Sequence, residues 1–171
     1  MKGQSALLFL EAHPNSTVSS FDLGNYRWSR PLAALLQRAY GKQRLVVTFG
    51  YTNRTLPKYA ATHPRGGKCD VAFIDGDKTR VGRLKDMKEV RRLYKPSTIF
   101  FDEATSLDCV SSQARCAAAC EADRRHKSDL WGGATLAYCD AAQQGLITIQ
   151  RCAWPPGMQD MDGICVGTFR Y

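Results

Sequence analysis

Short runs rich in apolar and β-branched residues alternate with segments that have helical spacing or helix-boundary residues. The runs predict strands at Thr17–Phe21, Leu45–Phe49, Val71–Ile74 and Thr98–Phe101. The segments around them predict helices at Ser5–Ala12, Ser29–Tyr40, Leu56–Ala61 and Lys78–Lys95. This βαβα order, with apolar strands, predicts an α/β fold: a mostly parallel sheet with helices on both faces.

The last third of the chain is less regular. A helix is predicted over Gly133–Gln144, and strands over Leu146–Ile149 and Cys165–Phe169. The stretch 104–130 holds cysteines and charged residues, and we expect an insertion or lid there. With 171 residues and no linker or repeat, the chain 1–171 is expected to be a single domain.

Basic residues exceed acidic ones by 24 to 16, a formal charge of +8, and they gather in Lys78–Lys95, where eight basic residues face Asp86 and Glu89. If this segment is a helix, one arc of it is apolar, with Arg83 and Arg91 at the margins of the arc. The apolar residues on that arc are Leu84, Met87, Val90 and Tyr94. The pattern favours a packed helix with a solvated basic face over a nucleic-acid surface, because no aromatic interleaving or RNA-binding signature accompanies it.

The cellular location of the protein and the state of its cysteines are inferred from the lack of membrane-span and secretion signals in the sequence. No apolar run approaches the roughly 18–20 residues of a membrane span, and Ala6–Leu10 is followed by no cleavage signal. We therefore expect a cytoplasmic protein whose seven cysteines are mostly free thiols rather than a disulfide framework. A metal site at Cys116-x3-Cys120, with Cys109 nearby, is the alternative.

Three predicted strands are followed directly by an acid: Asp22, Asp75 and Asp102. Ligands of open parallel sheets bind beyond the carboxyl ends of the strands, so these acids are candidates for a site. Asp22 is suited to accept hydrogen bonds from ribose hydroxyls. An equally favoured alternative is that Asp22 only forms a turn ahead of Gly24. Asp75 and Asp102 are expected side by side, with Glu103 and Asp77 adding negative charge nearby. Four carboxylates at one edge suit a hard divalent ion; the alternative is a set of Asx turns.

An ordered set of strings resembles the class I S-adenosylmethionine-dependent methyltransferases, and most closely a small group with an "FIDGDH"-like fourth strand. The strings are Ser19–Gly24, Thr55–Pro57, Cys69–Lys78, Leu84–Asp86, Leu93–Pro96, Phe100–Glu103, Ala141–Ile147 and Gly163–Tyr171. The resemblance implies a Rossmann-like, seven-stranded sheet of family order 3-2-1-4-5-7-6, with methyl transfer from S-adenosylmethionine.

The resemblance also assigns roles to individual residues. The cofactor would be bound by Asp22, Leu23, Tyr51, Thr52 and Asp75. Mg²⁺, the second expected cofactor, would be bound by Asp75, Asp102 and Glu103, in a string similar to the "VDADK" of cation-dependent O-methyltransferases. Lys78 would be catalytic, holding the methyl acceptor or accepting its proton.

Two segments depart from the family pattern. The family begins with a strand and a glycine-rich turn, whereas Met1–Ser5 leads directly into the first predicted helix. We expect an N-terminally truncated family domain in which the missing strand leaves a gap of about 9.6 Å in the sheet; the alternative is that Ala6–Leu10 supplies the strand. Gly50-Tyr51-Thr52 also stands where relatives have Gly-Asp-Ser.

The expected function is therefore that of a methyltransferase-like domain acting on an oxygen of a small-molecule methyl acceptor, with a nitrogen as the less favoured alternative. One alternative is a non-catalytic interaction module of the same fold. Another is a nucleotide-binding oxidoreductase, which Asp22 also suits. No membrane partner is expected, nucleic acid is disfavoured, and a homo-oligomer is left open.

Overall fold

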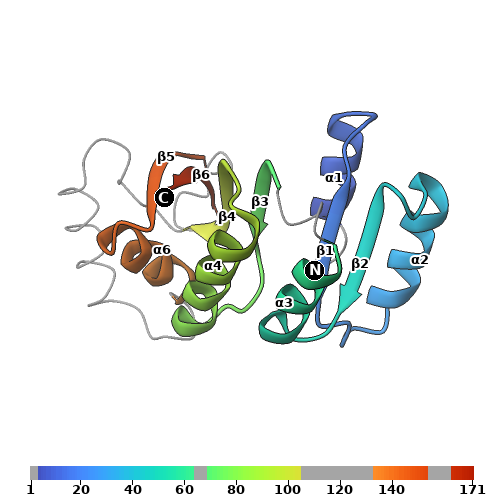
Figure 1. Cartoon of the computed structure of the whole chain (residues 1–171), viewed down its shortest axis with the longest axis horizontal. Coiled ribbons are helices and arrows are strands. Elements are labelled where there is room, and N and C mark those ends of the chain that lie inside the picture. Colours follow the sequence, from blue (N-terminus) through green and yellow to red (C-terminus); the bar gives the residue numbers. More distant parts are fainter. Residues whose placement is uncertain (1–3, 64–68, 105–132, 154–162) are drawn as a thin grey trace. The chain divides into compact units, whose positions relative to one another are not determined.

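The structure, a computed structural model, describes residues 4–63, 69–104, 133–153 and 163–171 (Figure 1). The chain divides into two compact units, Met1–Tyr59 and Ala60–Tyr171, and each is described by itself. The helices are α1 (Gln4–Ala12), α2 (Ser29–Tyr40), α3 (Thr52–Thr62), α4 (Arg80–Tyr94) and α6 (Gly133–Gln143). The strands are β1 (Val18–Asp22), β2 (Leu45–Phe49), β3 (Val71–Ile74), β4 (Thr98–Ala104), β5 (Ile147–Ala153) and β6 (Gly163–Phe169).

The first unit is built on the parallel pair β1–β2, in which Val18 lies opposite Leu45. Helices α1 and α2 pack on one face of this pair, around a core of Ala6, Leu10, Leu45, Val18, Leu36, Tyr40 and Val47. The other face of β1 meets Tyr59 of α3, whose hydroxyl hydrogen-bonds the Ser19 hydroxyl at 2.7 Å and whose ring contacts Phe21 edge-on. Because successive strand residues point to opposite faces, helices cover both faces of this sheet, as predicted.

The second unit holds a four-stranded sheet in the order β3-β4-β6-β5. Strands β3 and β4 are parallel, and β6 is antiparallel to both of its neighbours, so only β6 runs against the other three. Helices α4 and α6 lie side by side against this sheet (Figure 1). The largest fully buried apolar side chains of its core are those of Met87, Ile99, Phe101, Tyr138 and Ile147.

These pairings are the two halves of the family order 3-2-1-4-5-7-6 with the first strand left out. The pair β2–β1 corresponds to 3-2, and β3-β4-β6-β5 corresponds to 4-5-7-6. The described residues form two separate sheets, where the resemblance implied one of seven strands. Ala6–Leu10 lies within helix α1, so the alternative that this segment supplies the missing strand is wrong.

The element boundaries follow the local signals with a few shifts. Helix α2 carries Pro31 in its first turn and ends at Gly41, whose φ of 83° favours glycine. The Thr79 side chain caps α4 by accepting the Gly82 N–H. Helix α3 starts at Thr52, four residues before the predicted start, and β4, β5 and β6 are also longer than predicted. The predicted insertion at 104–130 lies outside the described residues except for Ala104.

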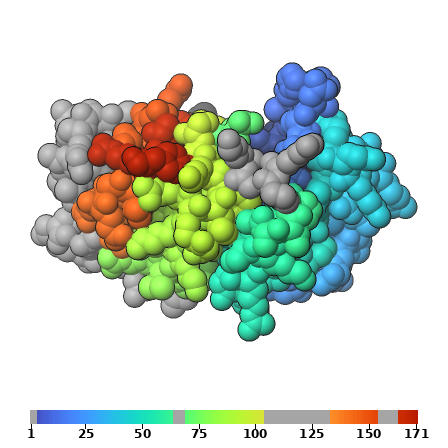
Figure 2. All heavy atoms as spheres, viewed as in Figure 1, coloured from blue at the N-terminus to red at the C-terminus, as the bar shows by residue number. Residues whose placement is uncertain are grey.

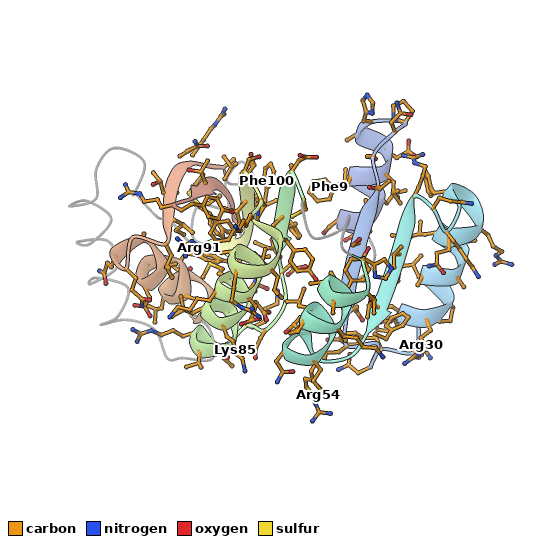
Figure 3. The ribbon with its side chains drawn as sticks, viewed as in Figure 1. Phe9, Arg30, Arg54, Lys85, Arg91 and Phe100 are labelled. Carbon is orange, nitrogen blue, oxygen red and sulfur yellow. A yellow bond between two sulfur atoms is a disulfide. The ribbon has the colours of Figure 1, made fainter. Side chains whose placement is uncertain are left out.

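The basic segment forms the packed helix that its pattern predicts. Met87 and Tyr94 are buried, and Leu84 and Val90 pack against the same core. Atoms of α4 also form part of the surface in Figure 2, and Lys85, labelled in Figure 3, is exposed. Arg83, which the pattern places at the margin of the apolar arc, is fully buried.

The prediction of mostly free thiols is also wrong for the described cysteines. Cys152 of β5 and Cys165 of β6 form a disulfide between adjacent strands, and Cys139 is disulfide-bonded as well. Among the described cysteines only Cys69 is free. The proposed metal site at Cys116 and Cys120 lies outside the described residues.

In the described parts of the chain, none of the helices has both the length and the apolar character needed to cross a membrane.

Candidate functional site

A cluster of three carboxylates lies at the carboxyl ends of β3 and β4. The parallel register pairs Ile74 with Phe101, so the next residue of each chain segment, Asp75 and Asp102, comes to the same edge of the sheet. One carboxylate oxygen from each of Asp75, Asp102 and Glu103 lies within 4.8 Å of the other two. The structure thus brings together the three residues that the sequence predicted as metal ligands.

An irregularity in β4 lets two consecutive residues serve this cluster. Phe101 lies opposite Cys165 and Ala104 opposite Gly163, so two β4 residues face one residue of β6, which is a β-bulge. Glu103 has a φ of 60°, in the left-handed region. In a regular strand the side chains of Asp102 and Glu103 would point to opposite faces, whereas here both carboxylates reach the cluster.

Helix α6 holds the backbone of the bulge. The Tyr138 hydroxyl donates to the Asp102 carbonyl at 2.5 Å, and the Thr135 hydroxyl donates to the Glu103 carbonyl at 3.3 Å. Both side chains come from the buried face of α6. The shape of the bulge therefore depends on residues well separated from it in the sequence.

Lys78 supplies a cation from the solvent side of the cluster. Its Nζ lies 2.6 Å from Asp75 Oδ1, 2.8 Å from Glu103 Oε1 and 3.9 Å from Asp102 Oδ2, and 47% of its side chain is exposed. Burial by itself lowers the pKa of Lys78, but its hydrogen bonds with Asp75 and Glu103 outweigh that effect and the pKa is raised. Lys78 is therefore an ammonium ion at neutral pH in this arrangement.

Burial and neighbouring negative charge act together on the pKa of Asp102. Burial raises the pKa of Asp102 to about 7, and the hydrogen bond and negative charge of Asp75 add to that effect; Lys78 opposes it. A carboxyl group with this pKa exchanges a proton near neutral pH. Asp77, in contrast, forms an Asx turn by accepting the Thr79 N–H at 2.8 Å, as the alternative interpretation of these acids predicted for the set.

Arg83 is the residue of this site that the sequence analysis missed. Its side chain is fully buried and its NH2 lies 3.3 Å from Glu103 Oε2. The helical pattern of α4 gave no sign of this contact, because Arg83 lies at the edge of the apolar arc, where a long basic side chain usually extends to solvent. The one feature of the sequence that could have indicated Arg83 is the predicted carboxylate cluster, because three clustered carboxylates need a positive charge nearby.

The remaining predicted cofactor residues lie in the first unit, at the carboxyl ends of β1 and β2. Asp22 Oδ1 accepts the Gly24 N–H at 2.7 Å, so the predicted turn is present. A carboxylate has further acceptor positions, so this turn is compatible with a ligand contact. Leu23 and Tyr51 are exposed, at 49% and 68%, and Thr52 is the first residue of α3.

The Gly50 N–H donates to the Asp22 carbonyl at 2.9 Å, which joins the ends of β1 and β2. Asp22, Leu23, Tyr51 and Thr52 therefore share one edge of the first sheet. Asp75, the fifth predicted cofactor residue, belongs to the carboxylate cluster of the second unit.

The donor set of the carboxylate cluster suits a hard divalent cation. Mg²⁺ takes oxygen ligands at 2.0–2.1 Å, which places neighbouring ligand oxygens about 3–4 Å apart. The separations of up to 4.8 Å between oxygens of Asp75, Asp102 and Glu103 are wider than that range, and binding of Mg²⁺ would require these side chains to rotate toward one another. The Lys78 ammonium already shows that a cation is held among these oxygens.

Comparison with solved structures identifies the fold. The O-methyltransferase TomG from Streptomyces achromogenes, involved in tomaymycin synthesis and solved in complex with SAM, matches with a TM-score of 0.68 and 15% identity, over 99% of this chain and 70% of that chain. Cofactor-bound Rv0187 from MTB matches with a TM-score of 0.68 and 22% identity, over 99% and 69%. A protein from Klebsiella pneumoniae matches with a TM-score of 0.66 and 15% identity, over 99% and 70%.

No protein-family model and no curated protein sequence matches the chain. The match to these solved structures shows that the chain has the Rossmann-like fold of class I methyltransferases, as the sequence strings predicted. At these identities the likeness establishes the fold.

Proposed function

We propose that this chain is an S-adenosylmethionine-dependent methyltransferase domain that acts on an oxygen of a small molecule. The observation that carries the proposal is the cluster of Asp75, Asp102 and Glu103 around Lys78, at the carboxyl ends of parallel strands. The fold is shared with an O-methyltransferase that was solved with SAM, and this supports the same assignment.

The first unit would bind the nucleoside part of the cofactor. The Asp22 carboxylate would accept hydrogen bonds from two ribose hydroxyls while its Oδ1 keeps the Gly24 N–H. Tyr51 is exposed and would lie against the adenine ring, with Leu23 and Thr52 lining the same edge. Asp75 is the fifth residue of the proposed cofactor set.

The second unit would bind the methyl acceptor. Asp75, Asp102 and Glu103 would hold Mg²⁺, which when bound neutralises an acceptor oxygen as it loses its proton. Lys78, whose ammonium group contacts Asp75 and Glu103 in the structure, would leave them when the divalent ion binds and would then hold the acceptor oxygen. Methyl transfer needs no covalent enzyme intermediate, so alignment of the two reactants supplies much of the acceleration.

Calorimetric titration with S-adenosylmethionine tests the proposal directly. We expect the wild-type chain to bind, and D22N to bind at least about 10-fold more weakly because it removes a charged acceptor. Asn retains the side-chain oxygen that accepts the Gly24 N–H, so the turn is preserved in this variant. The matched control is D70N at an exposed acid, which should bind like wild type. Absence of binding to the folded wild-type chain would contradict the proposal.

One observation favours a second candidate, a non-catalytic module of the same fold. Lys78 and Arg83 together offset two of the three negative charges of the cluster, so the cluster does not require a metal or ligand to persist. Folded protein that binds neither S-adenosylmethionine nor a divalent ion would support this candidate. A parallel titration with NAD tests the oxidoreductase alternative, which leaves the carboxylate cluster without a role.

A further inference from the structure

Arg83 is the only residue on the buried positions of α4 that carries a positive charge, and it is 0% exposed. Removing a guanidinium from water is unfavourable unless its donors are paired, because Arg stays charged in proteins. A buried arginine therefore needs a specific set of acceptors. The structure shows three of them, and all belong to the strand ends that form the carboxylate cluster.

Each guanidinium nitrogen of Arg83 has its own acceptor. NH1 donates to the Ile74 carbonyl at 2.6 Å, Nε donates to the Asp77 carbonyl at 2.9 Å, and NH2 donates to Glu103 Oε2 at 3.3 Å. Ile74 and Asp77 flank Asp75 in the chain. Arg83 thus links the segment that carries Asp75 to the bulge that carries Glu103.

The two oxygens of Glu103 are held by two different cations. Oε1 faces the Lys78 ammonium at 2.8 Å, and Oε2 faces Arg83 at 3.3 Å. Lys78 is 47% exposed, on a flexible side chain that can move away, whereas Arg83 is enclosed and its fork is rigid. A divalent ion entering from solvent would displace Lys78 and leave Arg83 in place.

We propose that Arg83 is a positioning residue for the carboxylate cluster. Its buried guanidinium fixes the Glu103 carboxylate and the backbone on both sides of Asp75, so that these oxygens are preorganised for a divalent cation. This inference rests on the metal site in the proposed function and adds a residue to it. Tyr138 supports the same arrangement, because its ring lies 5.9 Å from the guanidinium carbon and its hydroxyl holds the Asp102 carbonyl.

The test measures the affinity of the whole chain for Mn²⁺, by the electron paramagnetic resonance signal of free Mn²⁺, in three variants. R83M removes the charge and all three hydrogen bonds and keeps an unbranched apolar side chain, and we expect Mn²⁺ affinity to fall at least 10-fold. R83K keeps the charge but not the fork, and it should recover part of that loss. R92M is the matched control, because Arg92 lies on the same helix in an exposed ion pair with Glu89; it should bind Mn²⁺ like wild type.

A merely structural role is separated from positioning by a double-mutant cycle. If Arg83 acts through Glu103, R83M and E103Q will lower Mn²⁺ affinity by less in combination than the product of their separate effects. Wild-type affinity in folded R83M would overturn the inference and leave the metal site standing. If R83M does not fold, R83K decides, with a loss of at least 3-fold expected and wild-type affinity overturning the inference. Absence of Mn²⁺ binding in the wild type would overturn the metal site and this inference together, without affecting the S-adenosylmethionine titration.

Discussion

Asp102 and Glu103 are neighbours in the sequence, and their carboxylates serve the same cluster, each with an oxygen within 4.8 Å of the other and of Asp75. A regular strand would separate them to opposite faces. The bulge between Phe101 and Ala104 and the left-handed backbone of Glu103 remove that separation. Backbone irregularity at this point is thus a part of the site, held by hydrogen bonds from α6.

The left-handed backbone of Glu103 predicts an inverted stability order for two truncations. Ala normally stabilises a chain relative to Gly, but at a φ of 60° the Cβ is unfavourable and Gly is not. We therefore expect E103G to be more stable than E103A by about 1 kcal/mol in urea unfolding. Equal stability, or a more stable E103A, would contradict the assigned backbone conformation.

The sequence was sufficient to predict most of the fold. The apolar runs at Val71–Ile74 and Leu45–Phe49 are strands with the predicted boundaries, and Asp75 follows its strand at the predicted edge. These predictions succeed because a buried strand in a parallel sheet needs a continuous apolar run, which is a local property of the sequence. The side-by-side position of Asp75 and Asp102 follows from the same rule with one further assumption, the order of the strands.

The burial of Arg83 and the β-bulge in β4 could not be predicted from local sequence patterns. The bulge is defined by the register of β4 against β6, a strand that lies about 60 residues further along the sequence. The position of Arg83 depends on acceptors at Ile74, Asp77 and Glu103, three carbonyl or carboxylate groups that only the folded chain brings together. Hydrophobic periodicity shows which face of a helix is apolar. It does not show that a buried polar side chain will find hydrogen-bond acceptors on other segments of the chain.

The raised pKa of Asp102 predicts that one contribution to stability is lost as pH rises. The folded chain holds a proton on this carboxyl up to about pH 7, whereas the unfolded chain releases it near pH 4. Between these values the folded state binds more protons, so the free energy of unfolding falls with increasing pH. D102N cannot ionise, and it should remove this slope.

Urea unfolding of the wild type and D102N at pH 5 and pH 8 measures the effect. We expect D102N to be more stable relative to wild type at pH 8 than at pH 5, by roughly 1–3 kcal/mol. The control is D70N, at an exposed acid outside the cluster, whose stability should follow that of wild type at both pH values. A D102N slope as steep as that of wild type would show that another group is responsible.

A two-pronged ion pair joins α4 to α6. Arg80 Nε and NH2 lie 2.6 and 2.9 Å from the two carboxylate oxygens of Asp140, whose side chain is only 9% exposed. Removal of the Arg80 guanidinium leaves that carboxylate buried with less compensation, so R80M should lower the free energy of unfolding by about 1–3 kcal/mol. R92M, at an exposed ion pair on the same helix, should cost less than R80M, because water and salt screen a surface pair. An R80M cost no larger than that of R92M would contradict this account.

The disulfide between Cys152 and Cys165 predicts that the stability of the second unit depends on redox conditions. The bond joins adjacent strands β5 and β6 across a sequence separation of 13 residues. A loop of this size restricts the unfolded chain by an amount worth about 3 kcal/mol, although the measured gain varies between proteins. We expect dithiothreitol to lower the midpoint temperature of thermal unfolding of the wild-type chain. Alkylation followed by mass spectrometry should count the thiols that reduction releases.

A double variant, C152A/C165A, distinguishes this bond from the others in the chain. Cys139 is also disulfide-bonded, so some response to dithiothreitol should remain in the variant, and the difference between the two responses belongs to the β5–β6 bond. Cys69 contributes little to alkylation of the folded protein, because burial raises the pKa of its thiol to about 11. A wild-type midpoint unchanged by the reductant, with the thiols of Cys152 and Cys165 modified, would show that the strand pairing holds without the bond. The expected loss of stability would instead favour folding in an oxidising compartment over the cytoplasmic location that the sequence suggested.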